Sequence, residues 1–136
     1  MNTSGKTTGK IDTKVLLATL WIVVMINMAY ADILSLHIPG ALEEVAKTSV
    51  STGAPIPQLM LGGAIMLEIP IAMIFLSRVL KYEVNRCANI IASVITIAYV
   101  VGGGILYPHY LFIATIEVVC MLLIAWNAWK WTNPEG

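Results

Sequence analysis

Charged residues are scarce in this chain. They make up 12% of its 136 residues, whereas soluble domains carry about 25%. Eight basic and eight acidic residues give a net charge of zero, so no concentrated basic surface is available for nucleic acid. The sequence also lacks a glycine-rich phosphate loop and a nucleophile elbow, which argues against conventional nucleotide and hydrolase chemistry.

Cysteine is equally rare, with Cys87 and Cys120 only. The pair forms no CxxC motif, and the topology derived below puts one near a membrane surface and the other inside the membrane. We therefore expect no disulfide, and both residues are interpreted as small apolar packing residues. The sequence predicts no bound cofactor and no metal centre.

Long apolar runs are what the chain has in abundance, since 58% of its residues are hydrophobic. A transmembrane helix needs about 20 predominantly apolar residues. Four such runs are present, at about residues 15–36, 58–80, 87–106 and 110–131. The sequence thus predicts an all-α fold, a transmembrane four-helix bundle that forms a single domain over residues 13–132. Residues 1–12 are predicted to be a disordered cytoplasmic tail.

The basic residues give the direction of insertion, because Lys and Arg accumulate in cytoplasmic loops. Seven of the eight fall on one side of the predicted spans, and Lys47 is the exception. The seven are Lys6, Lys10, Lys14, Arg78, Lys81, Arg86 and Lys130. Both termini and the link between the second and third spans are therefore predicted to be cytoplasmic.

An alternative for the N-terminus is a secretory signal, because the lysines and apolar run are followed by Ala29-Tyr30-Ala31, an A-x-A pattern. The apolar stretch continues to Leu36, however, which makes it span-length and favours a retained helix.

The connections carry local signals of their own. A short interfacial helix is predicted after Pro39, with Glu43 and Glu44 in its early turns and Lys47 near its end, all suited to the helix dipole. Residues 49–55, rich in small polar residues, are predicted to form a flexible loop. In the next link, Asn85 is predicted to be the N-cap of the third span.

Three carboxylates interrupt the apolar runs: Asp32, Glu68 and Glu117. Ionised side chains near the bilayer centre cost at least about 2.5–3.5 kcal/mol each, so they usually face protein or water. Counted at about 1.5 Å per residue, these three and Tyr99 all fall in the outer half of the bundle. Because no basic residue lies at that depth, we expect at least one carboxyl group to be protonated and to donate a hydrogen bond.

Helical spacing predicts which side chains face inward. On the first span these are Trp21, Met25, Met28 and Asp32; on the third, Ala88, Ala92, Thr96, Tyr99 and Gly103; on the fourth, Ile113, Glu117, Cys120, Ile124 and Asn127. Pro70 is expected to kink the second span beside Glu68, and Gly62 and Gly63 to admit a close neighbour. The alternative for Pro70 is that the kink only shapes helix packing.

Several motifs together resemble those of a family of small bacterial four-helix membrane proteins of unknown function. They are the segment 30–35 (YADILS), Pro39-Gly40, Ile69-Pro70, Leu76-Ser77, Asn85-Arg86, Asn89-Ile90 and the tail 125–131 (AWNAWKW). The resemblance spans most of residues 13–132. It implies a prokaryotic inner-membrane protein with four helices, and it assigns no catalytic or binding residue.

Three hypotheses for function follow. In the first, Asp32, Glu68, Tyr99 and Glu117 bind or move a proton, a cation or an amphipathic ligand. In the second, the chain is a structural or accessory subunit of a membrane complex, or a homo-oligomer, and its polar residues only hold helices together. In the third, the acids catalyse proton transfer in a lipid-soluble substrate. A metal site formed by His37, His109 and Asp32 is a weaker possibility.

Overall fold

The computed structural model describes residues 11–103 and 107–132, and over these residues the secondary structure is entirely helical. Its helices are α1 (Thr13–Leu36), α2 (Ala41–Thr52), α3 (Ile56–Val79), α4 (Tyr82–Gly102) and α5 (Pro108–Lys130). All except α2 are long and apolar enough to cross a membrane. The all-helical prediction with four span-length helices is therefore confirmed. Most of the predicted tail, residues 1–10, lies outside the described residues.

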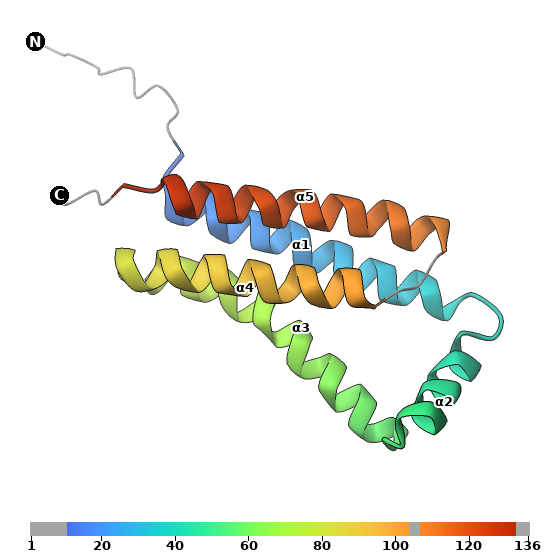
Figure 1. Ribbon diagram of the computed structural model, residues 1–136. Coiled ribbons are helices and arrows are strands. Elements are labelled where there is room, and N and C mark those ends of the chain that lie inside the picture. Colours follow the sequence, from blue (N-terminus) through green and yellow to red (C-terminus); the bar gives the residue numbers. More distant parts are fainter. Residues whose placement is uncertain (1–10, 104–106, 133–136) are drawn as a thin grey trace, which may run out of the picture.

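The four long helices form an open bundle. α1 packs against α5 and α3, and α4 packs against the same two helices. Figure 1 shows α1, α4 and α5 running alongside one another, whereas α3 diverges from them towards α2. The buried residues of α3 are Pro70, Met73 and Ser77, all in its second half. Only 11% of the apolar window of α3 is buried, compared with 33% in each of the other three long helices.

The two ends of the bundle differ in charge. One end holds the start of α1, the end of α5 and the turn between α3 and α4 (Figure 1). We call it the basic end, because it carries Lys14, Arg78, Lys81, Arg86 and Lys130. At the opposite end, here called the α2 end, α2 links α1 to α3, and Lys47 pairs with Glu44 across 2.8 Å. That hydrogen bond raises the pKa of the exposed Lys47 ammonium.

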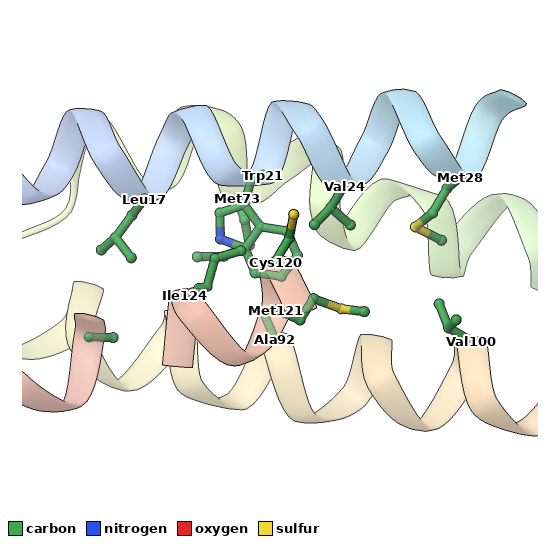
Figure 2. Packing of buried hydrophobic residues seen from close by; sticks show 11 residues of the cluster. Leu17, Trp21, Val24, Met28, Met73, Ala92, Val100, Cys120, Met121 and Ile124 are labelled. Atoms are coloured by element: carbon green, nitrogen blue, oxygen red, sulfur yellow. The ribbon is translucent and has the colours of Figure 1, made fainter. Parts of the chain in front are cut away.

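The core is one cluster formed mainly by α1, α4 and α5, to which α3 contributes Met73. Figure 2 shows Leu17, Trp21, Val24 and Met28 in a row along α1, pointing towards residues of the facing helices. Their spacing of three and four residues is that of one helical face. Ala92 and Val100 of α4 and Cys120, Met121 and Ile124 of α5 belong to the same cluster in this view.

The short helix expected after Pro39 is present as α2, but it extends further than the sequence predicts. Residues 49–52 are helical rather than loop. The Ser51 and Thr52 hydroxyls donate to the carbonyl oxygen of Thr48, so these residues satisfy local backbone acceptors inside a helix. Gly53, with φ of 72°, ends α2 in the left-handed conformation, which glycine adopts without strain.

Asn85 does not cap α4, so that prediction is wrong. α4 begins at Tyr82 with Lys81 as its N-cap, which puts Asn85 inside the helix and fully buried. Its Nδ2 donates to the carbonyl oxygens of Ser77, at 2.8 Å, and Leu80, at 3.2 Å. Carbonyl groups at the end of a helix lack intrahelical partners. Asn85 therefore provides a hydrogen-bond donor to carbonyl groups at the end of the preceding helix, α3.

Candidate functional site

Glu117 is the carboxylate that the structure buries. It lies on the inward face of α5 together with Ile113, Cys120 and Ile124, and it is only 3% exposed. Its Oε1 atom has no hydrogen-bond partner in the described part of the chain. Buried polar groups in proteins are nearly always hydrogen-bonded, so each exception requires an explanation.

The second buried atom without a partner is Oγ1 of Thr96 on α4, the helix that packs against α5. Thr96 is 1% exposed and shares the inward face of α4 with Ala92 and Val100. A threonine hydroxyl in a helix usually donates to a carbonyl one turn earlier. Thr19 and Thr115 of this chain do so, whereas Thr96 does not. Two neighbouring helices thus each contribute an unsatisfied oxygen to the bundle interior.

The remaining polar side chains of the candidate site lie nearer the α2 end. Asp32 is close enough to Glu117 for the two charges to interact. Tyr99 and Tyr110 also lie within electrostatic range of Asp32, and Tyr110 lies within range of Glu117. Asp32 is exposed and Tyr99 is 39% exposed. The arrangement is a buried acid with a second acid and two phenols between it and the end of the bundle.

Glu68 does not join this group. The Tyr99 hydroxyl lies 3.8 Å from where a Cβ atom of Gly63 would be, so Gly63 marks the face of α3 that turns towards α4. At 100° per residue, Glu68 is about 140° further round the helix. Its side chain is exposed. The expectation that Glu68 converges with Glu117 inside the bundle is therefore wrong, because Glu68 lies on a face of α3 that no other described helix covers.

The expected close approach at the glycines is confirmed for Gly63 alone. Gly62 has nothing within 4 Å of its Cβ position. The predicted inward-facing residues are confirmed only in part. Met25 and Asn127 are half-buried, and Gly103 is exposed.

The histidines do not form a metal site with Asp32. In residues 11–103 and 107–132, no group of three or more His, Cys, Asp or Glu side chains is placed to hold a metal ion. The ring Nδ1 of His37 contacts the carbonyl oxygen of Ile33, and Nε2 of His109 lies 3.2 Å from the Ser35 hydroxyl. His109 thereby joins the start of α5 to the end of α1.

A buried polar network at the basic end was missed by the sequence reasoning. Asn85, Asn89 and Ser93 occupy one face of α4, and all three are fully buried. Asn89 accepts hydrogen bonds from Trp21 of α1 and Ser77 of α3. The signal was present in the sequence as three polar residues at intervals of four. It was overlooked because the third span was assumed to begin at Cys87, which put Asn85 outside the helix.

These features define a class: an all-helical bundle with four helices long and apolar enough to cross a membrane and a buried, unpaired carboxyl group within it. The chain belongs to DUF6326, a family of unknown function whose sequence pattern matches residues 8–135. The resemblance to a family of unknown function is thereby confirmed. No curated protein and no solved structure matches the chain.

Proposed function

We propose that the chain is a four-span protein of the bacterial inner membrane, with both termini and the α3–α4 turn in the cytoplasm. The basic end supports this orientation through the positive-inside rule. Indole rings at the same end support it too. Lys130 lies 4.6 Å from the ring centre of Trp126, and Arg86 lies 5.6 Å from that of Trp129. Tryptophan with adjacent cations is typical of the headgroup level.

Within that bundle, we propose that Glu117 binds a proton and exchanges it for a cation or a cationic amphipathic ligand. The observation that carries the proposal is the unpartnered Oε1 atom of a side chain that is 3% exposed. An ionised carboxylate without a partner in such surroundings costs several kcal/mol. The group must therefore hold a proton or pair with a cation.

The surroundings of Glu117 fit this exchange. The unpaired Thr96 hydroxyl on the neighbouring helix α4 is a second buried oxygen without a partner in the described part of the chain. Asp32 and Tyr99 lie between Glu117 and the α2 end, so an incoming cation meets a carboxylate before it reaches the buried one. In the described chain, all Lys and Arg side chains belong to the basic end, except Lys47 on α2. No internal cation competes for the acid.

The experiment uses the full chain in liposomes, with tetraphenylphosphonium as the lipophilic cation. Binding is followed with a selective electrode, and proton release with a pH-sensitive dye. The wild-type protein is expected to bind the cation and release a proton, and Glu117→Gln is expected to do neither. Glu68→Gln makes the same chemical change on an exposed face and is expected to retain both responses.

An infrared measurement tests the protonation of Glu117 separately from cation binding. A protonated carboxyl group has a C=O stretching band in the infrared, which shifts in deuterium oxide. Loss of one such band in Glu117→Gln is expected if Glu117 holds the proton. Equal cation binding and proton release in the wild type and Glu117→Gln would remove the proposal.

A second function has its own supporting observation. The buried network around Asn89 joins three helices, as expected of a scaffold in an accessory subunit. That reading predicts that the chain copurifies with a larger membrane complex. It also predicts that Glu117→Gln changes stability without changing binding or proton release.

A further inference from the structure

α3 carries a regular seam of residues on its outward face. Successive members are separated by alternating steps of four and three, which is the heptad spacing of helices that pack along their length. All of the members are exposed. The seam consists of Leu61, Ile65, Glu68, Ala72, Phe75 and Val79.

Glu68 sits in the middle of this seam and of α3 itself (Ile56–Val79). Several other polar side chains in the long helices that are exposed or half-buried donate a hydrogen bond to the carbonyl oxygen four residues earlier in their own helix. These are Thr19, Asn27, Thr115 and Asn127. Glu68 makes no hydrogen bond to any of the residues that the structure describes. In a membrane it therefore presents an unsatisfied carboxyl group where lipid chains offer no partner.

We propose that the α3 seam packs against the same seam of a second copy of this chain, with the two Glu68 carboxyl groups hydrogen-bonded to each other. Two copies inserted in the same direction are related by a two-fold axis along the membrane normal. Such an axis puts a surface patch against itself. Each seam residue then meets its own counterpart at the same depth. A hydrogen bond between the two carboxyl groups requires at least one proton on the pair.

The occupant is a second copy because the seam is complementary to itself. Its apolar members recur with the period of a helix pair, and the small Ala72 beside Glu68 allows the helices to approach closely. A protonated carboxyl group is both donor and acceptor, so Glu68 is a complete partner for Glu68. The basic side chains of another copy cannot serve, since those of the described residues lie at the helix ends or on α2. Of the four long helices, α3 also has the least cover from its own chain.

Cysteine crosslinking in liposomes tests the geometry. Cys87 is exposed, so Cys87 and Cys120 are first replaced by alanine. Ala72→Cys is then compared with Val94→Cys, which lies on an exposed face of α4 away from the seam. Oxidation is expected to convert most of the Ala72→Cys protein into a disulfide dimer and little of the Val94→Cys protein. Equal crosslinking of both variants, or none at position 72, would overturn the proposal.

Variants at Glu68 test the carboxyl pair. Glu68→Leu keeps an apolar seam but removes the hydrogen bonds, so the dimer dissociation constant in bilayers is expected to rise about 3- to 20-fold. Glu68→Gln offers a donor and an acceptor and should stay within about 3-fold of the wild type. Leucine at an exposed position does not threaten folding, and the helical circular dichroism signal checks this.

Single-molecule photobleaching of the labelled chain at low density in liposomes counts the copies in each spot. Two-step bleaching in the wild type, reduced in Glu68→Leu, supports the dimer. Single-step bleaching throughout, or copurification of a different membrane protein crosslinked to position 72, overturns it. Both results are independent of cation binding at Glu117.

Discussion

The indole Nε1 of Trp21 donates a hydrogen bond of 2.8 Å to Oδ1 of Asn89, which ties α1 to α4 across 68 residues of sequence. The same oxygen accepts from the Ser77 hydroxyl of α3 at 3.2 Å. Nδ2 of Asn89 donates to both the backbone and the side-chain oxygen of Asn85. One fully buried amide thus satisfies polar groups from three helices.

Asn89→Ala is expected to lower the free energy of unfolding by about 1–3 kcal/mol. It leaves the Trp21 indole and the Ser77 hydroxyl unpaired in the interior, and each lost partner carries a desolvation penalty. Interhelical hydrogen bonds in membranes average about 0.6 kcal/mol, which keeps the expected value near the lower end. The measurement is an unfolding titration with dodecyl sulfate in mixed micelles, followed by tryptophan fluorescence.

Asn127→Ala is the matched control for this loss. Asn127 donates only to the carbonyl oxygen of Leu123 in its own helix, so its removal is expected to change stability by less than about 0.5 kcal/mol. Equal effects of the two alanine variants would show that the network does not hold the helices together.

Glu117→Leu is expected to stabilise the bundle by about 1–3 kcal/mol in the same titration. The substitution replaces a buried, unpaired carboxyl group by an apolar side chain, which removes its desolvation penalty. Glu117→Gln keeps a polar group in the same place and should leave stability nearly unchanged. A loss of stability in Glu117→Leu would instead indicate that the carboxyl group is already paired with a bound ligand.

Gly53→Ala and Gly62→Ala are expected to have opposite effects, although neither new methyl group meets an atom within 4 Å. At Gly53 the φ of 72° strains any L side chain, at a cost of about 1–2 kcal/mol. Hydrogen exchange of the α2 amides should therefore accelerate. Gly62 lies inside α3, where alanine is the better helix former by up to about 1 kcal/mol. Unchanged exchange in α2 would show that Gly53 is not required to end it.

The proposed orientation is tested by labelling single cysteines in a background without Cys87 and Cys120. Val50→Cys on α2 should react with a membrane-impermeant maleimide in intact cells. Glu83→Cys in the first turn of α4 should react only after the membrane is opened. Both side chains are exposed, so local burial does not account for a difference. The reverse pattern would invert the topology.

The elements of the fold are predictable because each long helix is a long apolar run, and the start of α2 carries clear helix signals. Which face of each helix points into the bundle is much harder to predict. In a helix surrounded by lipid, apolar residues point both inward and outward, so the hydrophobic pattern that orients a soluble helix is weak. Glu117 was correctly expected to face the interior. The same expectation was wrong for Glu68, because nothing in the local sequence reveals how sparsely the rest of the chain covers α3.

In such a bundle, polar residues indicate which face of a helix is buried. The spacing of Asn85, Asn89 and Ser93 marks the buried face of α4, yet the partners Trp21 and Ser77 lie on other helices. Which helices meet is a property of tertiary packing, and no spacing within one helix contains it. The sequence therefore indicates that α4 has a buried polar face, but it does not predict the hydrogen-bond partners of that face.

The bond from Asn85 to the end of α3 has a consequence for biogenesis. It closes the α3–α4 hairpin through contacts between residues only five and eight positions apart, so the hairpin can form as soon as its second arm leaves the ribosome. α1 is synthesised before this hairpin and contacts it through the hydrogen bond from Trp21 to Asn89. α5 is synthesised last. The carbonyl oxygen of Trp129 in α5 then accepts from Arg86, and that of Trp131, just beyond the end of α5, accepts from Tyr82. We expect truncation before α5 to leave a hairpin that still inserts, with its two ends facing the same compartment.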